Sequence, residues 1–215
     1  TTPGGSIVAP RMIIAVNAFA ERFGYWKGRL LPFEAQASLT RPLTDAEHAL
    51  IGSVKPWGLT PVNAFVSTTM RLTAGRRIMV RYFLRYSPEQ RTSAARLEAI
   101  RAAHLKVLRS RFPMLPDLGL EHTWTGYVCL SRNNAPGFGK VDDNVWSAVC
   151  QNAVGVTKGT IAGLLAADLA CGQDNPLIAD MEGLGTPARL PPRPLLDIGV
   201  RLRNAWDGWR GAYEY

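Results

Sequence analysis

Residues 151–163 read QNAVGVTKGTIAG, which indicates the end of a strand, a glycine turn and a helix that continues to about Ala170. Gly155, Gly159 and Gly163 recur every four residues, although a glycine inside a helix costs about 1 kcal/mol relative to alanine. We therefore expect a bare helix surface that another group approaches closely. The unpaired N–H groups and the positive dipole end at such a helix start suit a negatively polarised atom of a cofactor.

The composition is that of an ordinary globular protein. The chain has 215 residues, 47% hydrophobic and 20% charged, enough for a substantial core. Cys129, Cys150 and Cys171 are odd in number and lack CxxC spacing. This argues against a disulfide framework or zinc site and favours a reducing, cytoplasmic compartment. The three histidines are far apart, so we expect no metal site, and no segment predicts a membrane span.

The formal net charge is +8, which is compatible with binding to nucleic acid or another anion. Much of the excess lies between Arg91 and Arg111, where apolar residues from Leu97 to Leu108 recur at helical spacing. The basic side chains then fall mainly on the outward face. A solvated helix surface is the favoured interpretation, and an anion or partner surface is the alternative. No zinc finger, RNA-recognition motif or KH signature is present, so we expect no nucleic acid partner.

The first residues predict strands that need a neighbour. Residues 2–5 read TPGG and predict a turn, because proline fixes the first central position and glycine permits positive φ at the next. A short strand is predicted at residues 6–9 and a buried strand at residues 12–16. A hairpin turn at the first position requires a preceding strand. We therefore expect a processed fragment or a subunit, with a frayed terminus as the alternative.

The middle of the chain, from about residue 31 to residue 130, predicts an antiparallel α+β region. Ile78 and Val80 alternate with Arg77 and Arg81, as in a sheet with one wet face. The predicted strands are residues 35–40, 65–73, 77–86 and 122–131. The basic helix packs across them and ends at Phe112, before Pro113.

The pattern changes after Pro136. Residues 145–170 predict a strand, a glycine turn and a helix, which is the arrangement found in α/β proteins. A proline-rich tail follows, and a short amphipathic helix is predicted near residues 200–209.

Six blocks occur in a fixed order over nearly the whole chain. They are MIIAVNAF at residues 12–19, SLTRPL at 38–43, MRLTAGRRI at 70–78, WTG at 124–126, NAPGFG at 134–139 and GVTKG at 155–159. This order resembles the C-terminal part of FAD-dependent oxidoreductases of the D-amino-acid oxidase type, and most of all the branch that includes gamma-glutamylputrescine oxidoreductases. In that family an N-terminal part carries the GxGxxG turn and the acidic residue for the FAD ribose. This sequence contains no such element.

The resemblance implies the C-terminal portion of a two-domain flavoprotein of mixed α+β and α/β class. Residues 1–20 and 136–180 would complete a Rossmann-like FAD-binding domain. Residues 21–135 would form a substrate domain whose antiparallel sheet lies over the flavin, and residues 181–215 a C-terminal extension. FAD is the implied cofactor, and the implied partner is a chain that carries the nucleotide-binding segment.

The same resemblance places the flavin ring at the start of the predicted helix. The matching residues are Gly155, Val156, Thr157, Lys158 and Gly159. In the family, N–H groups here stabilise negative charge on the reduced flavin, and Lys158 is also the candidate catalytic residue. Asn17, in the first block, is a further candidate cofactor contact. A glycine-rich helix packed on a sheet is the alternative, but it does not explain a lysine in the first turn, where the dipole opposes a cation.

Candidate substrate contacts are Arg71, Tyr82, Trp124 and Trp57. A solvated strand arginine is the plainer interpretation of Arg71, and core packing that of Tyr82 and Trp124. Trp57 would line the entrance from a loop, and Arg41 is either a substrate-side or a structural residue.

The sequence departs from the family pattern in two places. Relatives often hold an amino-acid carboxylate with an arginine on the strand that here reads YVCL, residues 127–130, and this strand has none. Some relatives attach flavin to a cysteine on this strand, and Cys129 lies about two residues from that position.

These residues predict FAD-dependent oxidation of an amine or amino acid, in which a C–N bond becomes an imine that water hydrolyses. No GxSxG motif and no plausible Cys–His pair indicate covalent catalysis. A non-catalytic subunit of a flavoprotein complex and a basic nucleic-acid-binding module are the alternatives.

Overall fold

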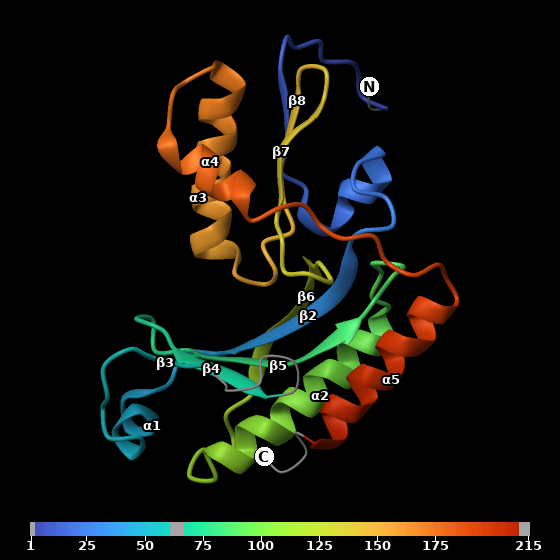
Figure 1. Cartoon of the computed structure of the whole chain (residues 1–215). Helices are drawn as coiled ribbons and strands as arrows, with labels where there is room; N and C mark the ends of the chain where they lie inside the picture. Colours follow the sequence, from blue (N-terminus) through green and yellow to red (C-terminus); the bar gives the residue numbers. More distant parts are fainter. Residues whose placement is uncertain (1–2, 61–66, 211–215) are drawn as a thin grey trace. The chain divides into compact units, whose positions relative to one another are not determined.

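The computed structural model describes residues 3–60 and 67–210, and the chain divides into two compact units (Figure 1). Unit 1 comprises Thr1–Pro32 and Val128–Leu196, and unit 2 comprises Phe33–Tyr127 and Asp197–Tyr215. Each unit is built on a sheet of its own. Within the described ranges, no helix is long and apolar enough to cross a membrane.

Unit 1 contains a three-stranded sheet in the order β1-β8-β7. Its strands are β1 (Met12–Ile14), β7 (Gly137–Asp142) and β8 (Val145–Val149). β1 is parallel to β8, whereas β7 and β8 form an antiparallel hairpin. Its helices are the 3-10 helix η1 (Asn17–Phe23), α3 (Gly155–Cys171) and α4 (Pro176–Gly183). The strand, turn and helix predicted for residues 145–170 are thereby confirmed.

One row of residues holds α3 on this sheet. Ala162, Leu165 and Ala166 are buried with Phe138 of β7 in one apolar cluster. The alanines permit a short distance between helix and sheet, because they add little side-chain volume. The helix ends at Gly172, whose φ of 69° forms a left-handed cap. Gly155, Gly159 and Gly163 form the neighbouring row of the helix.

Unit 2 contains a five-stranded sheet in the order β3-β4-β5-β2-β6. Its strands are β2 (Leu31–Thr40), β3 (Trp57–Leu59), β4 (Thr68–Leu72), β5 (Ile78–Tyr86) and β6 (Leu120–Leu130). The pairs β3–β4, β4–β5 and β5–β2 are antiparallel. The accompanying helices are α1 (Asp45–Leu50), α2 (Ala94–Arg111) and α5 (Leu195–Arg210).

α2 covers one face of this sheet (Figure 1). Val107 and Leu108 pack with Leu72, Ile78 and Val80 in a single buried cluster. Each such side chain typically contributes about 1.5–3 kcal/mol when it is fully buried. The apolar stripe and the outward basic face predicted for this helix are confirmed.

A buried carboxylate fixes the start of α2. Glu34 on β2 is 0% exposed and accepts hydrogen bonds from Arg85 at 3.2 and 3.1 Å and from Thr92 at 2.7 Å. Arg96 in the first turn of α2 adds an ion pair at 3.6 Å. Burial alone raises the pKa of Glu34, but the hydrogen bonds from Arg85 and Thr92 outweigh it and hold the pKa below its ordinary value.

The regular elements of unit 2 agree with the sequence. The hairpin is confirmed, since β4 and β5 pair through Met70↔Val80 and Leu72↔Ile78. The alternation along β5 is interrupted only near Phe83, where φ is 63° and the register with β2 shifts. The predicted helix near residues 200–209 is confirmed as part of the longer α5. Phe65 and Val66, predicted as strand, lie outside the described residues.

Of two predictions near the N-terminus, one is wrong and one is confirmed only in part. Residues 6–9 form no strand, and Ile7 and Val8 are 92% and 97% exposed. A strand needs pairing along its length, and residues 6–9 belong to neither of the sheets formed by the described residues. The buried strand at residues 12–16 is only the edge strand β1, in which Ile14 is buried and Ile13 is 39% exposed.

Besides η1 and β7, the structure contains three short elements that the sequence did not predict. α1 begins with a capping box between Thr44 and Glu47. α4 begins at Pro176, after Asn175 whose side chain caps the helix. The third element is the three-residue strand β3.

Candidate functional site

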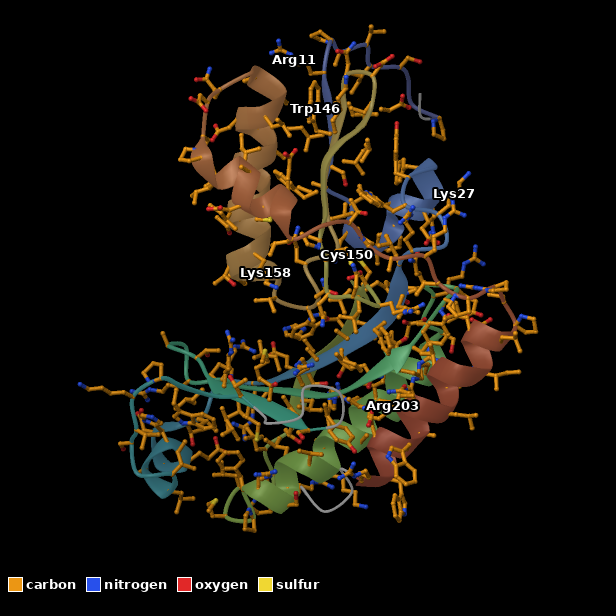
Figure 2. All side chains as sticks on the ribbon, in the orientation of Figure 1. Arg11, Lys27, Trp146, Cys150, Lys158 and Arg203 are labelled. Carbon is orange, nitrogen blue, oxygen red and sulfur yellow. The ribbon has the colours of Figure 1, made fainter. Side chains whose placement is uncertain are left out.

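The start of α3 lacks a cap. Val154 occupies the N-cap position and no side chain accepts a hydrogen bond from the first turn. Val156, Thr157 and Lys158 are exposed there, and Figure 2 shows Lys158 at this end of the helix. Lys158 makes no ion pair with any residue in the described part of the chain. The first N–H groups are therefore available to an acceptor from outside, as predicted.

The glycine surface of α3 is open. A methyl group added at Gly155 or Gly163 would meet no atom within 4 Å, and one at Gly159 would meet only Cγ of Gln151 at 3.7 Å. Val156, beside the first glycine, is 86% exposed. The sheet of unit 1 therefore does not require these glycines, and the predicted bare surface is confirmed.

A strained turn presents this helix start. Cys150, Asn152 and Ala153 all have positive φ, between 50° and 63°, although none is glycine. Such residues cost of the order of 1–3 kcal/mol each and persist only where surrounding contacts hold them. Asn152 supplies those contacts, since its Oδ1 accepts from the Ser131 N–H at 2.8 Å and its Nδ2 donates to the carbonyl of Asn134 at 3.0 Å. Strained, rigidly held backbone of this kind is typical of ligand sites.

Gln151 lies beside this turn. Its side chain is within reach of the first turns of α3, and its Oε1 is buried without a hydrogen-bond partner in the described structure. A buried acceptor that lacks a donor is costly, by about 1–3 kcal/mol. A ligand N–H would satisfy it. Gln151 was not among the predicted site residues. Its position directly before the glycine turn is the feature of the sequence that could have indicated it.

Asn17 connects β1 to the same turn. Its Oδ1 accepts hydrogen bonds from Sγ of Cys129 at 3.1 Å and from the Cys150 N–H at 3.2 Å. Asn17 therefore holds the turn in place, and its oxygen is already used within the protein. Any cofactor contact from this side chain has to use the amide nitrogen.

Cys129 is a poor attachment point for flavin. It is 0% exposed, and its hydrogen bond with Cys150 together with burial raises the pKa of its thiol. A thiol that stays protonated and inaccessible is a weak nucleophile. The two cysteines instead pack as small buried side chains around Asn17.

In unit 2, Arg71 and Trp57 line one hollow. The β3–β4 pairing places Gly58 opposite Arg71 and Trp57 opposite Leu72. A hollow of about 450 Å³ lies over this pair of strands, with Pro56 and Thr73 also in its wall. Arg71 is exposed, so its guanidinium can reach a ligand there. The structure thus brings together two of the four predicted substrate residues.

Tyr82 and Trp124 lie elsewhere in unit 2. Tyr82 packs against the cluster under α2 and lines a separate hollow of about 400 Å³ with Lys106 and Val107 of that helix. This position fits the core role that the sequence left open. Trp124 on β6 is 44% exposed and remains a candidate contact.

Arg41 is structural. It forms a two-pronged ion pair with Glu47, with both nitrogen–oxygen distances at 2.7 Å. The hydrogen bonds from Arg41 lower the pKa of Glu47 to about 2. The pair connects the end of β2 to α1.

Arg81 is a second residue, after Gln151, that was not predicted from the sequence. It is partly buried opposite Thr69 in the β4–β5 pairing, and its Nε and Nη2 donate to Oγ1 of Thr69 at 3.2 and 2.9 Å. Burial lowers its pKa, and no carboxylate pairs with it within the described residues. Thr69 and Arg71 are two apart on β4, so Arg81 shares a sheet face with Arg71. By contrast, Arg85 on the same strand has Glu34 as its partner.

Residues 1–169 match the family described as "DAO: FAD dependent oxidoreductase". This chain belongs to the DAO family. It is 27% identical to the Gamma-glutamylputrescine oxidoreductase of Escherichia coli (strain K12) over 215 residues, covering 99% of this chain and 46% of that protein. It is 20% identical to the Probable oxidoreductase OrdL of Haemophilus influenzae over 205 residues, covering 94% of this chain and 45% of that protein. The chain thus spans about half the length of these relatives.

The fold of this DAO-family chain also occurs in a solved structure. The glycine oxidase from Geobacillus kaustophilus superposes with a TM-score of 0.63 at 17% identity, over 88% of this chain and 48% of that one. The mixed α/β class and the antiparallel sheet predicted from the sequence are therefore confirmed, and the sheet has five strands.

FAD fits the start of α3. The family is FAD dependent, and three features of this chain suit a flat, electron-rich ring system with both donors and acceptors. These are the uncapped N–H groups after Val154, the bare surface at Gly155 and the unpartnered Oε1 of Gln151.

Proposed function

We propose that this chain supplies the flavin-ring contacts and the substrate sheet of an FAD-dependent oxidoreductase that oxidises the C–N bond of an amine or amino acid. The observation that carries the proposal is the uncapped, bare start of α3 in a chain of the DAO family. When bound, FAD accepts a hydride equivalent from the carbon that carries the nitrogen, and water then hydrolyses the resulting imine. Residues 1–20 and 136–180 would belong to the FAD-binding domain and residues 21–135 to the substrate domain, with residues 181–215 as an extension.

In this proposal the N–H groups of Gly155, Val156 and Thr157 stabilise the negative charge that develops on the cofactor. Removal of one fixed hydrogen-bond donor from a site with little water typically costs about 3–4 kcal/mol of transition-state stabilisation. Lys158 adds a positive charge at the same helix start. The strained turn at Cys150 and Asn152 keeps these donors in position before the cofactor arrives.

The substrate class is an amine that carries a carboxylate. Arg81 supports this, because a partly buried guanidinium without an anion is costly and a ligand carboxylate would pair with it. The relatives' names, gamma-glutamylputrescine oxidoreductase and glycine oxidase, also refer to amino compounds. Arg81→Gln should raise KM at least about tenfold for substrates with a carboxylate, with little effect on plain amines. Equal losses for both substrate groups would contradict this role.

The chain would need a second polypeptide segment for full activity. A dinucleotide is ordinarily held by a GxGxxG turn and an acidic residue, and the sequence has no GxGxxG motif. We therefore propose a partner chain or segment with that motif. Isolation of this chain alone, and of the complex captured through it, tests the point. Flavin bound to the isolated chain would argue against the dependence, and a complex free of flavin would argue against the enzyme.

A non-catalytic subunit is the second candidate, since the strand at residues 127–130 lacks the arginine found in relatives. Lys158→Ala and Gly155→Leu separate the two functions. In an enzyme, both changes should reduce turnover or flavin content while the complex still assembles. In a scaffold, turnover is absent from the start, and Gly155→Leu should affect only assembly.

A further inference from the structure

The helix α5 carries a row of apolar side chains that is exposed rather than buried. Leu195, Ile198, Leu202, Trp206 and Trp209 follow one another at intervals of three or four residues and are between 53% and 69% exposed. They form a continuous stripe on one side of the helix. We name these five residues the α5 stripe. In a helix that serves only the fold, such a stripe would be buried.

Polar bonds to β5 fix this orientation. Among the described residues, β4 pairs with β5 as far as Tyr82. Asn204 fills the place of a strand, since its Nδ2 donates to the Leu84 carbonyl at 3.0 Å and its Oδ1 accepts from the Tyr86 N–H at 3.4 Å. The Tyr86 hydroxyl also donates to Asp197 at 2.7 Å. The α5 stripe therefore points outward because the opposite face of the helix completes the sheet.

The charged side chains of α5 also divide between the outward and the inward side of the helix. At 3.6 residues per turn, Arg201 falls on one border of the α5 stripe, and Arg203 and Arg210 fall on the other. All three arginines are exposed, and Figure 2 labels Arg203 on this helix. The two acidic residues, Asp197 and Asp207, are half-buried on the inward side. Asp207 pairs with Arg203 at 2.9 Å, whereas Arg201 and Arg210 form no ion pair among the described residues.

We propose that α5 binds the surface of a bilayer that contains anionic lipids. An apolar stripe bordered by arginines, with tryptophans on the apolar side, matches the arrangement of helices that lie in the headgroup region. The arginines would contact lipid phosphates while the α5 stripe enters the boundary of the acyl chains. A second copy fits less well, because self-association of this face would bring arginine borders of like charge together. The proposal is independent of the flavin function.

Vesicle cosedimentation of the full chain tests this surface. The wild type should bind vesicles of phosphatidylglycerol and phosphatidylcholine, bind pure phosphatidylcholine weakly, and dissociate in about 1 M salt, where charges are screened within about 3 Å. Each arginine near an anionic leaflet contributes about a fivefold change in binding, so Arg201→Gln with Arg210→Gln should weaken it about 25-fold. Trp206→Ser with Trp209→Ser should weaken it at least about 20-fold.

Matched controls come from exposed residues elsewhere. Leu50→Ser with Leu184→Ser removes two side chains that are 60% and 56% exposed, and Arg91→Gln with Arg109→Gln removes two exposed charges, one shortly before α2 and one in its last turn. Neither pair should change vesicle binding more than about twofold. Circular dichroism checks that every variant is folded. No binding of the folded wild type at low salt, equal losses in the controls, or a wild-type dimer that the tryptophan variant dissociates would each overturn the proposal.

Discussion

α2 and α3 have nearly the same length, 18 and 17 residues, but their ends and faces are satisfied in different ways. Ser93 caps α2, with its Oγ accepting from the Arg96 N–H at 3.2 Å, and Glu34 ties the first turn to the sheet. α3 begins at Val154 without a cap, and its glycines meet open space. A helix that is completed by its own chain stabilises the fold. A helix with unsatisfied donors and a bare surface is available to a ligand or a partner.

The largest expected effect is a loss of folding stability at low pH, which arises from His104 of α2. His104 is 0% exposed and lies 2.7 Å from Oγ of Ser38, and burial lowers its pKa from 6.5 to about 4. A group whose pKa is depressed on folding stabilises the protein above its unfolded pKa, and this stability is lost as the pH falls. Between pH 6.5 and pH 4 the chain should lose about 3 kcal/mol.

Urea unfolding across this pH range measures the loss. His104→Met replaces the imidazole with a side chain of similar size that cannot titrate. The stability of this variant should therefore remain nearly constant between pH 6.5 and pH 4.5. Below about pH 4.5 both proteins should lose stability as carboxylates with lowered pKa values, such as Glu34 and Glu47, become protonated. The same slope in wild type and variant above pH 4.5 would contradict the role of His104.

The next effect concerns the ionic connection between α2 and the sheet. Glu34→Gln leaves Arg85 and Arg96 without a negative partner, although both are about one-third exposed and therefore partly solvated. We expect a loss of about 2 kcal/mol in the free energy of unfolding at neutral pH. Asp143→Asn is the control, because Asp143 is fully exposed in its pair with Lys140 and should have no measurable effect. A small loss for Glu34→Gln would show that α2 is held by apolar contacts alone.

Exchanging the caps tests the contrast itself. Ser93→Ala should destabilise the chain by about 1 kcal/mol, because an N–H group of α2 loses its acceptor. Val154→Asp should instead stabilise the chain by about 0.5–1 kcal/mol, since it gives α3 the cap it lacks. The same change should lower the flavin content of the complex, because the new carboxylate occupies the donors and repels negative charge. Thermal unfolding and flavin absorbance report the two outcomes separately.

The smallest expected effect is at Gly163. Alanine there meets no neighbouring atom, so Gly163→Ala should raise the stability of the isolated chain by about 0.5–1 kcal/mol. If another polypeptide packs on this surface, the same methyl group should weaken the complex in a pull-down with the tagged chain. Ala99→Gly on the exposed side of α2 should destabilise the chain by a similar amount without affecting the complex. Unchanged assembly with Gly163→Ala would remove this surface as a contact.

The features predicted from the sequence are those that depend on local patterns. The β4–β5 hairpin and α2 follow from the alternation after Arg77 and the helical spacing after Leu97. The bare face of α3 follows from glycine spacing alone. The segment at residues 6–9 has a strand-like pattern, but it joins neither of the sheets formed by the described residues.

The role of Arg81 could not be predicted in this way, because it depends on residues far apart in the chain. Arg81 resembles Arg77 and Arg85 in the sequence. They differ because Glu121 pairs with Arg77 and Glu34 with Arg85, whereas no carboxylate among the described residues pairs with Arg81. Whether an arginine is structural or free for a ligand is thus decided by the tertiary fold.

The central claim is that the start of α3 holds FAD in a complex with a second polypeptide segment. The most direct measurement is the visible absorption spectrum of the complex captured through an affinity tag on this chain, wild type beside Gly155→Leu. We predict the spectrum of an oxidised flavin with the wild type, loss of most of it with Gly155→Leu, and none in the isolated chain. A captured complex without flavin, or one whose flavin content is unchanged by Gly155→Leu, would contradict the claim.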